Sequence, residues 1–211
     1  MKETKELLLI FTRNPELGKV KTRLAKGVGE QHALTIYKKL LSHTHDQVKV
    51  LPVTKRVGYS NRVHDNDLWE NELFEKFAQE GDDLGIRMEA AFKQGFTDGY
   101  EKIIIIGSDL YDLKTAHLEA AFVALDTHDA VIGPALDGGY YLLGLRNLVP
   151  AIFYNKDWGT TTVLADTKED LKNKTVHYLE TLNDIDYAED LEGYPEFASY
   201  LKNTTTTSKT I

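Results

Sequence analysis

Four consecutive β-branched residues, Ile103-Ile104-Ile105-Ile106, constrain the fold of this chain more than any other segment. Because successive side chains of a strand point to opposite faces of a sheet, a strand with this sequence has two apolar faces. Such a strand is typical of the centre of a parallel sheet that helices cover on both sides. The run ends in Gly107-Ser108-Asp109, so a carboxylate directly follows the expected central strand.

Strand-like and helix-like segments alternate along the rest of the chain. We expect strands at residues 7–11, 48–53, 77–79, 103–106, 130–132, 140–145 and 175–179. We expect helices at residues 30–47, 66–74, 84–96, 115–125 and 161–171, and a broken helical segment over 190–201. This alternation predicts a single α/β domain over residues 1–202, a three-layer α/β/α arrangement with a mixed, mostly parallel sheet. The Thr-rich residues 203–211 are predicted to be a disordered tail.

Charge and composition narrow the classes of function. The formal net charge of -8 argues against nucleic-acid binding, which requires a basic surface. The chain has no cysteine, so it has neither a disulfide framework nor a thiol nucleophile. Its first apolar run, residues 7–11, is too short for a signal-peptide core or a membrane span. We therefore expect a cytoplasmic protein without a membrane span, of undetermined oligomeric state.

A basic segment follows the first expected strand. Arg13, Lys19, Lys21 and Arg23 lie close together in an otherwise acidic chain, with Gly18 among them. Ligands of parallel sheets bind at the carboxyl ends of the strands, and a helix start with Arg and Lys side chains there suits a diphosphate. The alternative is a solvated basic start of a helix, and charge alone favours that alternative. Arg87, in the segment 79–88, is a weaker candidate for a further phosphate contact.

Carboxylates provide a second set of candidates. Asp109 leaves the end of the expected central strand, and Asp184 and Asp186 form an Asp-x-Asp near the C-terminal end. Oxygen ligands of this kind suit Mg²⁺ or Mn²⁺. The alternatives are helix caps and an acidic loop, which are equally compatible with these residues.

The segment Asp137-Gly138-Gly139 lies between two apolar runs, residues 130–132 and 140–145. Asp-Gly between apolar segments is a hairpin signal because both residues tolerate positive φ. The two glycines could also let a ligand approach the backbone beside Asp137 and Tyr140. Trp158 could stack on a ligand, but a place in the core is the safer interpretation.

Five segments occur in a fixed order: Pro15-Glu16-Leu17-Gly18-Lys19-Val20-Lys21-Thr22-Arg23-Leu24, Gln79 to Met88, Gly107-Ser108-Asp109, Gly133 to Leu145, and Asp184-Ile185-Asp186. In this order they resemble a family of small bacterial proteins with the GT-A (nucleotide-diphospho-sugar transferase) fold. That family is described as glycosyltransferases, some of them associated with radical-SAM or selenium-related genes. The resemblance extends from the first strand to about Leu191. It implies a GT-A fold and a transferase that uses a nucleotide-sugar, a divalent metal and a small-molecule acceptor.

The resemblance also suggests roles for the candidate residues. The phosphate group of the donor would meet Arg13, Gly18, Lys19, Lys21, Arg23 and Arg87. Asp109, with Asp184 or Asp186, would hold Mg²⁺ or Mn²⁺. Asp137 would orient or deprotonate the acceptor hydroxyl, with Gly138, Gly139 and Tyr140 beside it.

Two other functions fit the same residues. The layout also resembles nucleotidyltransferases such as 2-phospho-lactate guanylyltransferase, which would join a nucleoside triphosphate to a phosphorylated acceptor and release pyrophosphate. A nucleotide-binding module without turnover is the third hypothesis. It is kept because Tyr111 stands where the family pattern has Pro, next to the candidate metal ligand Asp109.

Overall fold

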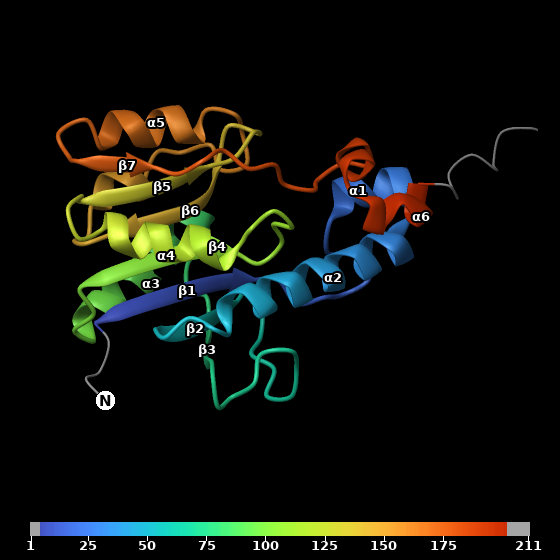
Figure 1. Cartoon of the computed structure of the whole chain (residues 1–211), viewed down its shortest axis with the longest axis horizontal. Coiled ribbons are helices and arrows are strands. Elements are labelled where there is room, and N and C mark those ends of the chain that lie inside the picture. Colours follow the sequence, from blue (N-terminus) through green and yellow to red (C-terminus); the bar gives the residue numbers. More distant parts are fainter. Residues whose placement is uncertain (1–4, 202–211) are drawn as a thin grey trace, which may run out of the picture.

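Seven strands form one mixed sheet in the order β3-β2-β1-β4-β6-β5-β7 (Figure 1). The computed structural model describes residues 5–201. The strands are β1 (Glu6–Thr12), β2 (Thr54–Tyr59), β3 (Glu75–Ala78), β4 (Lys102–Gly107), β5 (Ala130–Pro134), β6 (Tyr140–Leu145) and β7 (Val176–Tyr178). Strand β6 is antiparallel to both of its neighbours, and the other pairs are parallel. The predicted mixed, mostly parallel sheet is therefore confirmed.

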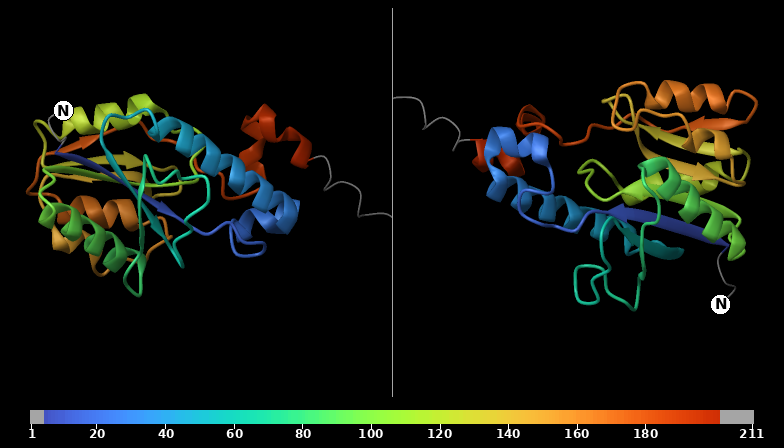
Figure 2. Two further views of the ribbon diagram at one scale, coloured as in Figure 1. Left: turned by 90° about the horizontal axis from the view of Figure 1, so that it is seen from below. Right: turned by 180° about the vertical axis from the view of Figure 1, so that it is seen from behind.

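Helices cover both faces of this sheet, as the apolar run in β4 predicts (Figure 2). Ile104 and Ile106 pack with helices α2 and α4, while Ile103 and Ile105 pack on the other face with α3. The helices are α1 (Thr22–Val28), α2 (Glu30–Val48), α3 (Leu84–Thr97), α4 (Thr115–Ala124), α5 (Val163–Asp170) and α6 (Ala198–Leu201). Three short 3₁₀ helices are η1 (Pro150–Phe153), η2 (Glu189–Gly193) and η3 (Pro195–Phe197). The three-layer α/β/α prediction is confirmed.

A third apolar cluster lies beyond the sheet, where α1 and the first half of α2 meet the C-terminal segment (Figure 1). Leu24, Ile36, Ile185, Leu191 and Phe197 are all buried there. This cluster brings residues 184–201 back against the start of the chain. It therefore places the Asp184–Asp186 segment beside the basic segment.

Two predicted elements are wrong. Residues 48–53 are not a strand, because α2 continues to Val48 and a turn precedes β2. Residues 66–74 are irregular instead of helical. The carboxylate of Asp67 accepts hydrogen bonds from the Trp69 N–H and the Tyr59 hydroxyl, and this local side-chain bonding competes with helix formation.

The remaining predicted elements are present with small shifts of their ends, and the hairpin between β5 and β6 is confirmed. The predicted disordered tail, residues 203–211, lies outside the described residues. Within residues 5–201, no helix has both the length and the apolar character needed to cross a membrane.

Candidate active site

The candidate site lies where β1 and β4 end side by side. These strands are parallel neighbours, with Phe11 opposite Gly107. The strand order runs outward in both directions from this pair, so it is the switch point at which open α/β sheets bind ligands. The Ser108 hydroxyl donates to the Thr12 hydroxyl at 3.0 Å, and both residues are buried. This bond ties the two strand ends together directly before Asp109.

Lys21 is the central cation of the site. It caps α1 in the left-handed conformation (φ 46°), and its side chain is only 5% exposed. Its Nζ lies 2.8 Å from Asp109 Oδ2 and 2.9 Å from Asp186 Oδ1. Burial lowers the pKa of Lys21, but the two carboxylates outweigh burial and raise the pKa above its ordinary value. Lys21 is therefore a charged lysine held between the β4 loop and the C-terminal segment.

The C-terminal carboxylates complete one side of the site. Arg23 donates to Asp186 Oδ2 at 3.2 Å and stacks over the Tyr187 ring at 5.9 Å. Asp190 holds this segment in place, because its carboxylate accepts the backbone N–H groups of Asp186 and Tyr187. The structure thus brings together the basic segment and the Asp-x-Asp, which are far apart in the sequence.

Negative charge exceeds positive charge around Asp184. The pKa of Asp184 is raised to about 6, first by burial and then by the neighbouring carboxylates of Asp137 and Asp186. Burial also raises the pKa of Asp109, but Lys21 outweighs burial and the pKa of Asp109 is lowered overall. The site therefore holds one surplus carboxylate that a cation would stabilise.

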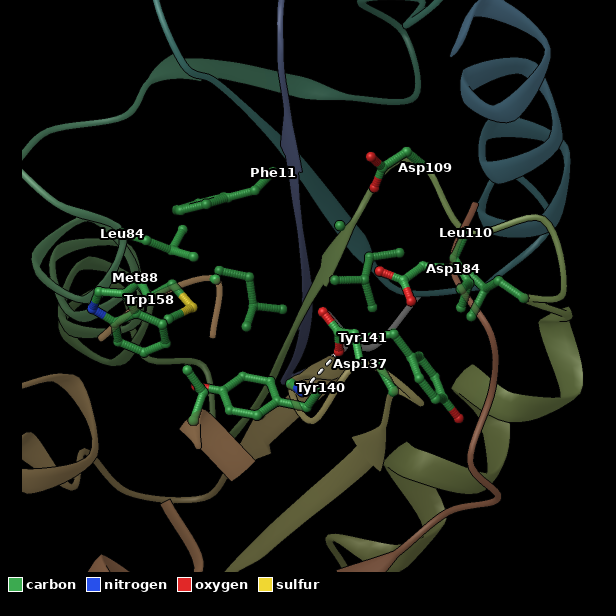
Figure 3. A pocket seen from close by; sticks show the side chains of 18 of the residues that line it. Phe11, Leu84, Met88, Asp109, Leu110, Asp137, Tyr140, Tyr141, Trp158 and Asp184 are labelled. Carbon is green, nitrogen blue, oxygen red and sulfur yellow. Dashed lines mark hydrogen bonds between the residues drawn. The ribbon is translucent and has the colours of Figure 1, made fainter. Parts of the chain in front are cut away.

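Two adjoining cavities meet at these carboxylates, and Figure 3 shows the lining of the smaller one. The larger, of about 690 Å³, is lined by four basic side chains, Arg13, Lys21, Arg23 and Arg87, after which it is called the cationic cavity, and also by six aspartates. The smaller, of about 260 Å³, has a mainly apolar lining. Asp109, Asp137 and Asp184 line both cavities and thus form the boundary between them.

The hairpin places Asp137 at this boundary. Asp137 Oδ1 accepts the Gly139 N–H at 2.8 Å, which leaves Oδ2 available for a ligand. Gly139 lines the apolar cavity, as does the ring of Tyr140. Gly138 was expected to let a ligand approach the backbone, but the space beside it is filled by Thr161. A Cβ at Gly138 would lie 2.4 Å from the carbonyl oxygen of Thr161. Gly138, with φ +89°, is therefore required for packing of the hairpin against the start of α5.

The other predicted phosphate-binding residues differ in position. Arg13 and Arg87 line the cationic cavity. Lys19 is 70% exposed, pairs with Glu16 on the surface, and is not part of either cavity wall. Gly18 has φ +73° and lies against the Glu30 carboxylate, so it shapes the turn of the basic segment.

One residue of the site, Tyr37, escaped the sequence analysis, and another, Trp158, was assigned to the core with ligand stacking as the alternative. Trp158 was expected in the core, but it is partly exposed and forms a wall of the apolar cavity. Tyr37 of α2 holds the start of the basic segment, because its hydroxyl donates to the Arg13 carbonyl and accepts the Arg13 N–H, both at 3.1 Å. Nothing in the local sequence of α2 indicates this contact between Tyr37 and the Arg13 backbone, since Tyr37 is one of several apolar residues on the buried helix face.

The carboxylates can be tested as ligands for a divalent cation. Among the described residues, no three His, Cys, Asp or Glu side chains are grouped closely enough to form a complete metal site. Mg²⁺ is commonly held by one or two carboxylates together with substrate phosphates and water. The carboxylates of Asp109 and Asp184 are hard oxygen donors, and they fit this second arrangement.

A family model matches this chain at residues 44–160, more than half of its length. The family is described as "Uncharacterized protein conserved in bacteria (DUF2064)". The chain belongs to the DUF2064 family. The matched segment includes Asp109 and the Asp137 hairpin, while Lys21 and Asp186 lie outside it.

Solved structures show the same fold as this DUF2064 chain. A protein of Desulfovibrio desulfuricans G20, described as a "putative nucleotide-diphospho-sugar transferase", is 32% identical with a TM-score of 0.82; the match covers 92% of this chain and 88% of that one. A cytidylyltransferase from Leptospira borgpetersenii is 14% identical with a TM-score of 0.60, covering 94% and 88%. A Mycobacterium tuberculosis H37Rv protein, solved in complex with manganese, is 12% identical with a TM-score of 0.55, covering 92% and 100%. No curated protein matches this chain significantly. The chain therefore has the nucleotide-diphospho-sugar transferase fold expected from its motifs.

Tyr111, where the GT-A family pattern has Pro, has a structural role in this chain. Its ring packs against Tyr194 and Phe197 at centroid distances of 5.4 and 5.0 Å, and against His43 at 4.8 Å. Tyr111 thereby anchors the C-terminal segment to the loop that carries Asp109.

Proposed function

We propose that this protein is a glycosyltransferase that uses a nucleotide-diphospho-sugar donor together with Mg²⁺ or Mn²⁺. The observation that carries the proposal is the cationic cavity at the ends of β1 and β4, in which basic side chains and carboxylates lie in direct contact. A diphosphate requires both cationic side chains and a site for its metal counterion. The description of the Desulfovibrio relative supports the same class of donor.

The basic segment would bind the diphosphate. Lys21 and Arg23 both contact Asp186, so phosphate oxygens would replace carboxylate oxygens of the same geometry. This exchange keeps both cations paired while the ligand binds. Arg13 and Arg87 would approach the phosphates from other parts of the cavity wall.

Asp109 and Asp184 would hold the divalent cation, and Asp186 lies next to them as a further oxygen donor. When bound, such a cation supplies positive charge that stabilises the departing diphosphate. The raised pKa of Asp184 supports this assignment, because a bound cation would offset both burial, its main cause, and the neighbouring carboxylates.

Asp137 would act on the acceptor. The acceptor oxygen forms a bond to the anomeric carbon of the sugar, and the bond from that carbon to the diphosphate oxygen breaks. The nucleoside diphosphate leaves with the electron pair, and the acceptor proton moves to Asp137 Oδ2. Asp137 suits this role because the Gly139 N–H fixes its other oxygen at the cavity boundary.

Nucleotidyl transfer is the second candidate, favoured by the fold likeness to a cytidylyltransferase. In that reaction the acceptor oxygen bonds to the α-phosphorus of a nucleoside triphosphate and pyrophosphate leaves. The cations and carboxylates would have the same contacts, so the products distinguish the two reactions.

Product analysis tests the proposal. The protein is incubated with Mn²⁺, acceptor pools, and either nucleotide sugars or nucleoside triphosphates. We expect release of a nucleoside diphosphate from a nucleotide sugar. Acceptor-dependent release of pyrophosphate would instead establish the second candidate, nucleotidyl transfer. Release of neither product would favour the third hypothesis, a nucleotide-binding module without turnover.

A binding experiment tests the site separately from turnover. Nucleoside diphosphates are titrated with and without Mn²⁺ while the melting temperature is followed, since a ligand that binds only the folded state raises it. Asp109→Asn should remove the Mn²⁺-dependent part of the shift. Arg23→Ala should weaken nucleotide binding at least tenfold, whereas Lys19→Ala, in the same segment but outside the cavity, should not. Equal effects of the two variants would exclude the basic segment as the phosphate site.

A further inference from the structure

The apolar cavity next to the phosphate site differs sharply from it in lining. Phe11, Leu84, Met88, Trp158 and the ring of Tyr140 surround it on one side, and the carboxylates Asp109, Asp137 and Asp184 lie on the other (Figure 3). Its volume of about 260 Å³ is below the usual range of drug-sized sites. The cavity is thus suited to one compact molecule that reaches the carboxylates at one end.

Charge restricts what this cavity can bind. Among the described residues that line it, there is no Lys, Arg or His, whereas the cationic cavity beside it has four such side chains. A phosphate or carboxylate placed here would lose its hydration without gaining a cation. It would also lie against the carboxylates of Asp109, Asp137 and Asp184, which repel an anion.

Uncharged polar side chains of the lining offer little to a ligand. The Tyr141 hydroxyl donates to the Glu180 carbonyl at 3.2 Å, and the Thr160 hydroxyl donates to the Asp157 carbonyl at 2.8 Å. The Tyr140 hydroxyl is buried without a hydrogen-bond partner, near Thr167 of α5. A molecule with many hydroxyl groups would leave most of them unpaired here, which disfavours its binding.

We propose that the apolar cavity is the acceptor subsite, and that it takes an uncharged molecule with an apolar or aromatic body and a single hydroxyl group. The aromatic and aliphatic walls hold the body, and the hydroxyl meets Asp137 at the boundary with the phosphate cavity. The role of the bound molecule as acceptor rests on the proposed function, whereas its chemical class follows from the cavity lining alone. The inference disfavours a phosphorylated acceptor.

The two tryptophans of the chain make a direct test possible. Trp158 lines the cavity and packs on the face of the sheet that α3 covers, while Trp69 is buried in the core cluster on the opposite face. Their indole N–H signals are followed by ¹⁵N NMR, with Trp158→Phe for assignment. The probes are benzyl alcohol and benzyl phosphate, which share one body and differ in charge, and no nucleotide is added.

Benzyl alcohol should shift the Trp158 signal in a saturable manner and leave the Trp69 signal in place. Benzyl phosphate should require at least a tenfold higher concentration for the same shift of Trp158. The inference is overturned if benzyl alcohol does not move Trp158 or if benzyl phosphate moves it at an equal or lower concentration. If the wild-type protein bound no nucleotide in the melting experiment, the cavity could not be called an acceptor subsite. The preference of the cavity for benzyl alcohol over benzyl phosphate would still stand.

A charge substitution tests the same reasoning without disturbing the core. Leu84 is 43% exposed at the edge of the cavity, so Leu84→Lys should fold. In the Trp158 titration, this variant should reduce the ratio of the benzyl phosphate concentration to the benzyl alcohol concentration needed for the same shift at least fivefold. Val123→Lys, at a 66% exposed position on α4, is the matched control and should change neither probe. An unchanged ratio in Leu84→Lys would contradict the charge argument.

Discussion

Replacement of Lys21 by Met should destabilise the fold in a pH-dependent manner. Met fills a similar volume but removes the cation between Asp109 and Asp186, whose oxygens lie 2.8 and 2.9 Å from Nζ. Removing one partner of a fully buried ion pair costs roughly 3–5 kcal/mol. The Asp109 and Asp186 side chains are 42% and 31% exposed, so solvent screening reduces the expected loss to about 1–3 kcal/mol.

The sign of the pH dependence follows from Asp109. Burial raises the pKa of Asp109, but Lys21 outweighs burial and holds that pKa below its unfolded value. An acid with a lowered folded pKa contributes stability above its unfolded pKa and loses that contribution as the pH falls. The Met variant lacks this contribution, so its deficit should be full at pH 7 and should shrink toward pH 3.5.

Urea unfolding of the wild type and the variant across this pH range measures the deficit. Lys19→Met is the matched control, because Lys19 lies two residues away, is 70% exposed and pairs only at the surface. It should leave the free energy of unfolding unchanged at every pH. The reasoning is refuted if the two variants behave alike, or if the deficit of Lys21→Met is the same at pH 7 and pH 3.5.

Three further variants test other parts of the structure. Asp184 has a folded pKa of about 6, above its unfolded value, so its ionisation lowers stability as the pH rises from 4 to 6. With chelator present, Asp184→Asn should therefore raise the melting temperature at pH 7.5 and not at pH 4. Gly138→Ala should lower the free energy of unfolding, measured by chemical denaturation, by roughly 2–4 kcal/mol, because the strain of a positive φ and a clash with Thr161 add together. Gly99→Ala, at a positive φ in open space, is the control and should lower it by only about 1 kcal/mol. Tyr111→Ala should lose about 2 kcal/mol and Tyr111→Phe should lose little, since the ring makes the contacts; equal losses would contradict that view.

The strands of the sheet were predictable where the apolar or polar character of their side chains matches their burial. Ile103–Ile106 could only be a strand covered on both faces, and the structure has it between β1 and β6. Strand β2 was missed because it contains Lys55 and Arg56. Lys55 is buried with its Nζ donating to two backbone carbonyls, and Arg56 pairs with carboxylates from other elements. Lys55 finds its partners in the turn just before β2, and Arg56 finds its partners on β3 and at the end of α3, so no alternation of apolar and polar residues marks this strand.

The site was predictable in its membership but not in its internal contacts. The carboxyl ends of β1 and β4 meet at one edge of the sheet, so Lys21 and Asp109 could be expected as neighbours. Their direct ion pair could not, because it depends on the left-handed backbone of Lys21. The position of Trp158 depends on packing against Gly85, where any Cβ would collide with the indole ring. Such fits arise only from the folded arrangement.

The contact between Lys21 and Asp186 joins residues 165 positions apart, across nearly the whole domain. Contacts of such long range form late, because the intervening chain must first be ordered. A polypeptide emerging from the ribosome would thus hold a nearly complete sheet before its ligand cavity has both walls. During synthesis, binding competence should appear abruptly once residue 186 and the 3₁₀ helix behind it are free to fold back.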